Sequence, residues 1–207
     1  DVVAWGWNNE GQTDVPEDLE DVIAIAARQY TSLALTASGN VVAWGNNDVG
    51  QIDVPDGLTD VIAISAGYHH SLALTASGDV VAWGWNDDGQ TDVPEDLEDV
   101  IAIAAGNRFS LALTASGDVV AWGRNIEGQT DVPDGLSDVI AIAAGFDHSL
   151  ALTFSGDVVG WGLNDDGQTD YDGLSADVVA ISAGGGHSLA LIASGDVVAW
   201  GWNDDGQ

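Results

Sequence analysis

Residues 61–84 read VIAISAGYHHSLALTASGDVVAWG, and versions of this stretch recur along the whole chain. The tryptophan near its end has counterparts at a constant spacing of 39 residues, at Trp5, Trp44, Trp83, Trp122, Trp161 and Trp200. Self-similarity at a fixed period near 40 residues is typical of units that bury their apolar faces against their neighbours. The 207 residues therefore predict one repeat domain, with units 1–39, 40–78, 79–117, 118–156 and 157–195 and a partial unit 196–207.

Short apolar segments separated by turn residues make up each repeat. Around Trp83 these segments are 61–67, 72–76, 80–83 and 90–93, and Pro94 follows the last of them. Segments of this length, rich in β-branched and aliphatic residues, are typical of strands, and proline ends a strand because it lacks the N–H that a ladder needs. We expect an all-β fold, a β-propeller of four-stranded antiparallel blades with the repeated tryptophans buried between the blades.

One strand is left over when the repeats are counted. The VVAWG type of segment occurs six times, whereas the VIAIAAG and LALTA types occur five times each. Residues 1–12 (DVVAWGWNNEGQ) and 196–207 (DVVAWGWNDDGQ) differ at two positions, so both suit the same place in a closed five-bladed ring. Either the chain is cut from a longer propeller, or one copy is displaced, or one copy pairs with another molecule.

The pattern VVAWGxNxxGQ, followed by VPxxLxDVIAIAAGxxHSLALTxSGDVVAWG, resembles the repeat of the regulator of chromosome condensation family. The repeat is similar to the short-loop bacterial form seen in beta-lactamase inhibitor protein II. The resemblance covers the whole chain, with small departures at Gly160 and at residues 171–172. It implies a propeller, commonly seven-bladed, that binds other proteins and performs no covalent chemistry. It does not identify a target, because nucleotide exchange and lactamase inhibition belong to particular members.

The charge is strongly one-sided, with 34 acidic residues against three Arg and a formal net charge of −31. Nucleic acid is excluded as a partner by this charge. At about 1 M salt the Debye length falls to roughly 3 Å, so the repulsion is screened, and we interpret the acidity as adaptation to high salt. A docking surface for a basic partner is the alternative. We expect no membrane insertion, and an extracellular or cell-surface location in preference to the cytoplasm of a salt-accumulating organism.

Catalytic and metal-binding chemistry finds little support in the repeats. A serine follows a histidine at His70, His148 and His187, but a catalytic pair is needed once, so we expect a structural role and no enzyme activity. The loops at 86–89 and 164–167 (Asn-Asp-Asp-Gly) lack the alternation and the distal Glu of a calcium loop, and favour Asx turns. We expect no metal and no cofactor.

Two stretches vary between repeats: the position two residues after each tryptophan, and the loop that follows the first strand. Antiparallel strands alternate in direction, so both loops should emerge at the same end of each blade. Aromatic residues, Arg and His collect there, and aromatics and Arg dominate binding energy at protein interfaces. The predicted partner-binding residues are Trp7, Arg28, Gln29, Tyr30, Tyr68, His69, Trp85, Asn107, Arg108, Phe109, Arg124, Phe146, Asp147 and Trp202.

These observations predict a non-catalytic, salt-adapted interaction module that binds a protein through one loop-bearing face. Drift at unconstrained loop positions is the simplest alternative explanation of the variation. A second alternative is an assembly module whose surplus terminal strand self-associates. A third is a lectin that stacks glycans on Trp7, Trp85 and Trp202.

Overall fold

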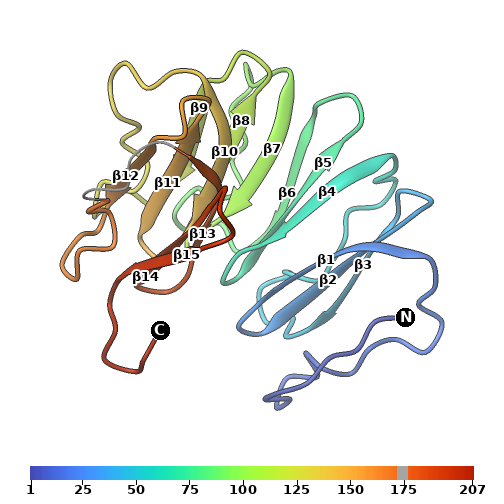
Figure 1. The fold of residues 1–207 in the computed structure, drawn as a ribbon. Coiled ribbons are helices and arrows are strands. Elements are labelled where there is room, and N and C mark those ends of the chain that lie inside the picture. The colour runs from blue at the N-terminus through green and yellow to red at the C-terminus, as the bar shows by residue number, and fades with distance from the viewer. Residues whose placement is uncertain (172–176) are drawn as a thin grey trace.

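The computed structural model describes residues 1–171 and 177–207 and consists of five three-stranded antiparallel sheets (Figure 1). Each sheet is formed by three consecutive strands, with the second in the middle. The strands are β1 (Val22–Arg28), β2 (Thr31–Thr36), β3 (Val41–Gly45), β4 (Val61–Ala66), β5 (His70–Thr75), β6 (Val80–Gly84), β7 (Val100–Ala105), β8 (Phe109–Thr114), β9 (Val119–Gly123), β10 (Val139–Ala144), β11 (His148–Thr153), β12 (Val158–Gly162), β13 (Val178–Ala183), β14 (His187–Ile192) and β15 (Val197–Gly201).

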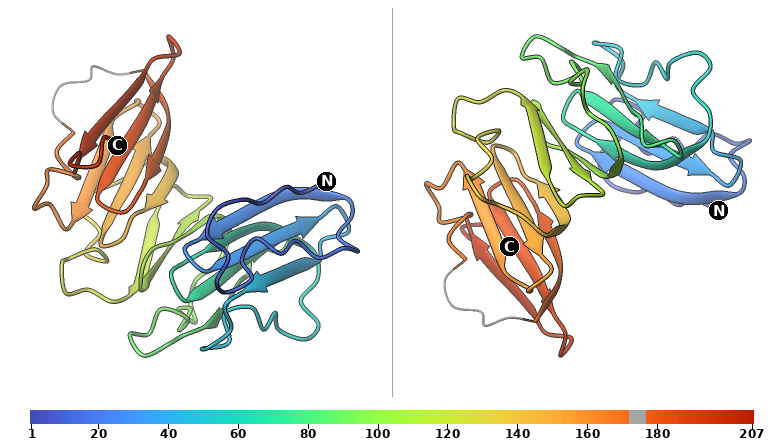
Figure 2. Two further views of the ribbon diagram at one scale, coloured as in Figure 1. Left: turned by 90° about the horizontal axis from the view of Figure 1, so that it is seen from below. Right: turned by 90° about the horizontal axis from the view of Figure 1, so that it is seen from above.

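The sheets follow one another around an open arc, with the first strands of successive sheets in contact near its centre (Figures 1 and 2). The first sheet, in blue, and the fifth, in red, lie at the two ends of this arc. The arrangement is that of propeller blades, but the ring is not closed. Within the described residues there is no helix that is long and apolar enough to cross a membrane.

The prediction of a fourth strand in each blade is wrong for the described residues, where every sheet has three strands. Residues 90–93 form turns, in which the N–H of Asp92 donates to the carbonyl of Gly89 and that of Val93 to the carbonyl of Thr91. The Asn86 side chain also donates to Asp92, at 2.6 Å. Because these groups are satisfied inside the loop, they do not extend the sheet. Of the departures noted at 171–172, Asp172 lies outside the described residues.

Neighbouring sheets pack through two complementary faces. The leucine face of a sheet carries two leucines of the middle strand, such as Leu33 and Leu35. The tryptophan face of the next sheet carries the tryptophan of its third strand with Val and Ala side chains, here Trp83, Val61 and Ala66. Equivalent clusters recur at the following interfaces, so the core is a series of slabs between sheets. Burying one Leu side chain stabilises the fold by roughly 1.5–3 kcal/mol.

A glutamine seven residues after each repeated tryptophan ties the sheets together. The main-chain carbonyl of Gln90 accepts both the indole Nε1–H of Trp122, at 3.0 Å, and the hydroxyl of Ser110, at 2.9 Å. The side chain of Gln90 is fully buried and its Oε1 accepts the N–H of Asp88 in its own loop. The same carbonyl bonds join Gln12, Gln51, Gln129 and Gln168 to the next sheet. This network accounts for the repeated Gln, Ser and Trp.

Two histidines add bonds between sheets. The Nε2 of His70 lies 3.1 Å from the Ser110 hydroxyl of the following sheet, and the Nε2 of His148 lies 3.0 Å from Ser188. Both histidines are fully buried. Burial, reinforced by the positive charge of Arg28, lowers the pKa of His70 to about 3 and that of His148 to about 4. Each histidine therefore bonds with the serine of the next sheet and not with the serine beside it in sequence.

The two copies of the terminal segment have different structures. Residues 197–201 form β15, paired with β14, and Trp200 donates to the Gln168 carbonyl at 2.9 Å. Residues 1–6 form no strand, and Trp5 is 85% exposed. The prediction that every repeated tryptophan is buried is therefore wrong for Trp5, because residues 1–6 pair with no strand in the part of the chain that the structure describes. Gln12, at the end of this copy, still makes the contacts of its repeat position.

Replacing Trp122 by Phe should lower the free energy of unfolding by about 1–3 kcal/mol, because the Gln90 carbonyl loses a buried donor and the smaller ring leaves a void. Trp5→Phe is the matched control and should change it by less than about 0.5 kcal/mol, since that ring is exposed. Denaturant unfolding measures both. Equal effects for the two variants would contradict the role given to the Gln90 carbonyl.

His70→Phe should make stability less sensitive to acid. The folded-state pKa of His70, about 3, lies below its unfolded value near 6.5. The unfolded chain therefore binds the extra proton, and the native state loses up to about 1.4 kcal/mol per pH unit as pH falls from about 6.5 toward 3. Phe109 occupies the same place in the third sheet, so the change fits the fold.

The unchanged protein and the His70→Phe variant carry the same carboxylates. The difference between their free energies of unfolding therefore isolates the contribution of His70. That difference, from denaturant titrations between pH 7 and about 4.5, should shift in favour of the Phe variant as the solution becomes more acid. Parallel curves would show that His70 titrates normally.

Candidate functional site

The two variable loops of each repeat emerge at the same end of their sheet, as strand direction predicted. Main-chain bonds hold them together: the N–H of Trp85 donates to the carbonyl of His69, at 2.8 Å. Arg124 and Arg108 are joined in the same way, at 2.9 Å, in the next sheet. The Ser-Gly-Asp turns lie at the opposite end. We call the end that carries the variable loops the variable face.

Aromatic side chains from three sheets and from residue 7 form one continuous cluster on the variable face. The ring of Tyr30 contacts Trp7 and Tyr68, with centroids 5.4 Å and 5.8 Å away. Tyr68 in turn lies 4.3 Å from His69 and 6.3 Å from Phe146. His69 then contacts Trp85, at 5.5 Å, which completes the cluster. Segments more than 100 residues apart in the chain thus meet at one surface.

Two arginines border this aromatic cluster. The Arg108 guanidinium lies over the Trp85 ring, 4.4 Å from its centroid, and its Nη1 is 3.5 Å from the Asp88 carboxylate. The Arg28 guanidinium lies 5.3 Å from the Phe146 ring. Cation–π contacts of this kind hold both the cation and the ring in place. The cluster is therefore held in one arrangement before any partner binds.

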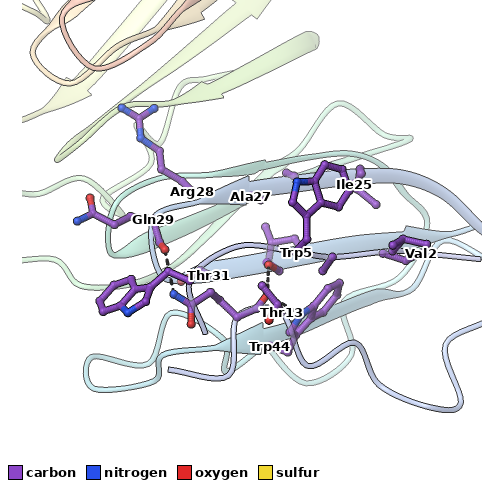
Figure 3. A pocket seen from close by; sticks show the side chains of 16 residues that line it. Val2, Trp5, Thr13, Ile25, Ala27, Arg28, Gln29, Thr31 and Trp44 are labelled. Carbon is purple, nitrogen blue, oxygen red and sulfur yellow. Dashed lines mark hydrogen bonds between the residues drawn. The ribbon is translucent and has the colours of Figure 1, made fainter. Parts of the chain in front are cut away.

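Arg28 crosses the centre of the arc. Its Nη1 donates to the carbonyls of Ala105, at 3.3 Å, and Ala144, at 3.2 Å, which end the first strands of the third and fourth sheets. Figure 3 shows the side chain extending from β1 toward those sheets. Burial lowers the pKa of Arg28 to about 10, partly offset by the Asp147 carboxylate, so the group stays charged at neutral pH.

A compensating change three residues later explains how Arg28 fits. The other four repeats have Gly at this position, and a Cβ added at Gly67 would come within 2.3 Å of the His70 ring. At Gly106 it would meet the ring of Phe109 in the same way. The first repeat has Thr31 where those rings stand, which leaves room for the longer side chain. A comparison of the repeat sequences can detect this compensation, because positions 28 and 31 both differ from their counterparts in the other four repeats.

One predicted partner-binding residue, Phe109, does not lie on the variable face. Phe109, His70 and His148 are fully buried between sheets. They follow the variable loops in sequence, but the first residue of each middle strand points inward, toward the next sheet. Phe109 therefore belongs to the core and is unavailable to a partner.

The remaining predicted residues lie around the cluster and do not form part of it. Gln29 donates to the Tyr30 hydroxyl, at 3.0 Å, and Asp147 accepts from Gln129, at 3.1 Å. The N–H of Asn107 donates to the Phe146 carbonyl, at 3.3 Å. Trp202, 39% exposed, packs beside Gly186 of the fifth sheet. Sequence comparison missed Phe154, a lone aromatic residue 83% exposed at the opposite end.

The candidate catalytic and calcium groups are occupied within the fold. The Ser110 hydroxyl is buried and donates to a main-chain carbonyl, so its proton is already committed. In the loop at 86–89, Asn86 spans its own turn by bonding Asp92 and the N–H of Thr91. Among residues 1–171 and 177–207, no group of three His, Cys, Asp or Glu side chains is placed to hold a metal ion.

Known structures share this arrangement of sheets. Human WBSCR16 superposes with a TM-score of 0.75 at 24% identity, over 89% of this chain and 63% of its own. Prp20p from Saccharomyces cerevisiae superposes with a TM-score of 0.76 at 26% identity, over 92% of this chain and 59% of its own. The WD40 ectodomain of the Arabidopsis thaliana receptor kinase ACR4 gives 0.76 at 23% identity, over 96% and 75%.

The chain spans about three fifths of the length of WBSCR16 and of Prp20p. No curated protein matches it in sequence. The sequence model of the regulator of chromosome condensation (RCC1) repeat matches five consecutive stretches, at residues 22–51, 61–90, 100–129, 139–168 and 178–207. Since these matches cover most of the chain, and since the structure repeats one sheet per match, the chain belongs to the RCC1 repeat family.

Proposed function

We propose that this chain is a non-catalytic binding protein that takes a protein partner on its variable face. The observation that carries the proposal is the continuous cluster formed by Trp7, Tyr30, Tyr68, His69, Trp85 and Phe146, bordered by Arg28 and Arg108. Trp, Tyr and Arg are the residue types that dominate binding energy at protein interfaces.

Exposure and order within the cluster support this use. Trp7 is 53% exposed and Phe146 40%, so apolar ring area faces solvent. Rings held by one another lose little freedom when a partner covers them, and this lowers the entropic cost of binding. Drift at unconstrained positions gives no reason for the variable residues of five separate segments to contact one another.

Related proteins agree with a protein partner. The solved structure of Prp20p is described together with its binding to Gsp1p and histones, and a second structure shows Kap60 bound to yeast RCC1. Those partners belong to Prp20p. For this chain they support a class of function, the binding of another protein by an RCC1-type propeller.

The lectin alternative is not favoured by the geometry of the cluster. The Arg108 guanidinium lies 4.4 Å from the centroid of the Trp85 ring and covers one of the two faces on which a sugar could stack. Trp202 is not part of the aromatic cluster, so the three tryptophans do not form a common platform.

Truncating the cluster should weaken binding without unfolding the protein. Trp85→Ala and Arg108→Ala should each cost about 2 kcal/mol of binding free energy, roughly thirtyfold in affinity, because each removes a side chain of the types that dominate binding energy at protein interfaces. The partner would first be captured from the source organism's lysate or culture medium in high salt and then titrated calorimetrically. The melting temperature should fall by no more than about 2 °C.

Phe154→Ala is the matched control, since it removes an exposed aromatic residue from the opposite end. It should leave affinity unchanged. Loss of binding with Phe154→Ala but not with Trp85→Ala or Arg108→Ala would assign the partner to the other end and overturn the proposal.

We also propose that the protein works at high salt, because a net charge of −31 opposes compaction and salt screens it. The melting temperature should rise steeply between about 0.1 and 2 M KCl, as the Debye length falls from roughly 10 Å to a few Å. Thermal unfolding followed by circular dichroism measures this. A flat or falling curve would remove the salt-adapted interpretation.

A further inference from the structure

Three polar side chains beside the aromatic cluster carry buried hydrogen-bond donors without acceptors. Gln90 is fully buried, and its side-chain Nε2 donates to no residue that the structure describes. The Nε atoms of Arg108 and Arg124 are also buried, and they too have no acceptor among residues 1–171 and 177–207. Buried polar groups in native proteins are normally paired, so these three donors need an explanation.

The three residues meet where the second sheet adjoins the third. The N–H of Arg124 donates to the Arg108 carbonyl, at 2.9 Å. A Cβ added at Gly123, the residue before Arg124, would lie 2.7 Å from that carbonyl and 3.1 Å from the Cα of Gln90. The second and third sheets each have a sheet on both sides, so this place is internal to the arc.

The next repeat shows which group satisfies the glutamine. The Nε2 of Gln129, the counterpart of Gln90, donates to the carboxylate of Asp147, at 3.1 Å. Asp147 follows Arg108 by one repeat of 39 residues and holds the same position. Where the fourth sheet supplies a carboxylate to the glutamine, the third sheet therefore places an arginine, which can only donate.

Arg108 and Arg124 also bring two positive charges together. The equivalent side chains of the second sheet, His69 and Trp85, have ring centroids 5.5 Å apart, so side chains at these two positions are neighbours. Arg108 has one ion pair, with Asp88 at 3.5 Å, and Arg124 has none with a described residue. The chain has 34 acidic residues for three arginines, so this weak pairing does not come from a shortage of carboxylates.

We propose that Gln90, Arg108 and Arg124, here called the carboxylate site, bind the side-chain carboxylate of an Asp or Glu of the protein partner. The inference rests on the proposed binding of a protein at the variable face and specifies the chemistry of that partner. Guanidinium groups bind carboxylates through paired N–H donors, and the glutamine amide adds a donor as Gln129 does for Asp147. The Arg108 guanidinium lies over Trp85, so an apolar side chain beside the carboxylate would reach the aromatic cluster.

The charge of the whole protein sets the condition under which this contact forms. A net charge of −31 repels an acidic segment at low salt. At about 1 M salt the Debye length is roughly 3 Å, so distant charges are screened, whereas partly buried pairs in direct contact are screened much less. We therefore expect the carboxylate site to bind at high salt.

A blocked amino acid tests the site without the partner. N-acetyl-aspartate N-methylamide carries only a side-chain carboxylate, and its asparagine counterpart is the neutral isostere. Each is titrated into the isotope-labelled full chain at about 2 M KCl, and the side-chain N–H signals of Gln90, Arg108 and Arg124 are followed by NMR. The aspartate compound should shift these signals saturably, and the asparagine compound should not. Absence of a saturable shift with the aspartate compound would overturn the proposal.

Two variants give changes of opposite sign. Arg108→Asp should weaken binding of the aspartate compound at least about tenfold, because it introduces the carboxylate that Asp147 provides one repeat later. Asp88→Asn should strengthen binding, because it removes the carboxylate that competes for Arg108. Asp87→Asn is the matched control, since it changes the net charge equally at an exposed neighbour, and it should have less effect. Weaker binding by Asp88→Asn would contradict a site for carboxylates.

Two further probes identify the source of the anion. N-acetylalanine presents a terminal carboxylate, and inorganic phosphate presents the group of a phosphorylated residue. Tighter binding of either probe than of the aspartate compound would overturn the assignment to an Asp or Glu side chain. The aromatic cluster is tested separately with Trp85→Ala and the captured partner, so failure of the carboxylate site and failure of the proposed function give different results.

Discussion

The carbonyl of one glutamine per repeat holds this structure together. It accepts two hydrogen bonds from the next sheet, one from a tryptophan indole and one from a serine hydroxyl, as at Gln90 with Trp122 and Ser110. These bonds lie at the edge of an apolar slab, where an unpaired carbonyl would cost about 1–3 kcal/mol. The glutamine side chain stabilises the loop that presents this carbonyl. Sheet position, loop shape and core packing are therefore determined by the same residue.

This linkage runs in one direction along the chain. Each sheet receives its contacts from the unit before it and offers the same set to the sheet after it. Stability in such an array is the sum of contacts between neighbours. Each internal interface therefore joins a leucine face of one sheet to a tryptophan face of the next.

Some of the repeated acidic residues have structural roles that charge alone does not suggest. Asp21, Asp60, Asp99 and Asp138 each precede a first strand with φ between 53° and 56°, a conformation that Asp tolerates better than most residues. Asp14, Asp53, Asp92, Asp131 and Asp170 each accept a bond from the Asn six residues earlier. Their recurrence reflects the turns that they stabilise. The excess of other acidic residues is what bears on salt.

The sequence by itself determined the repeat, the all-β class, three strands of each sheet and the end of the sheets at which the variable loops lie. These follow from local periodicity and from the alternation of antiparallel strands, which need no knowledge of other units. It also placed Trp7, Tyr30, Tyr68, Trp85 and Phe146 on one face, although not their contacts. Only the tertiary structure decided which groups near that face are buried. Phe109 and His70 point into the next sheet, and Arg28 of the first sheet reaches the third and fourth sheets.

Only the tertiary structure showed that residues 90–93 form turns and that residues 1–6 form no strand whereas residues 197–201 do. The two terminal segments are almost identical, so no local property distinguishes them. One pairs with β14, which precedes it in the same unit, whereas residues 1–6 pair with no strand among the described residues. Burial and pairing depend on which neighbour supplies the facing surface, and that is a property of the assembled arc.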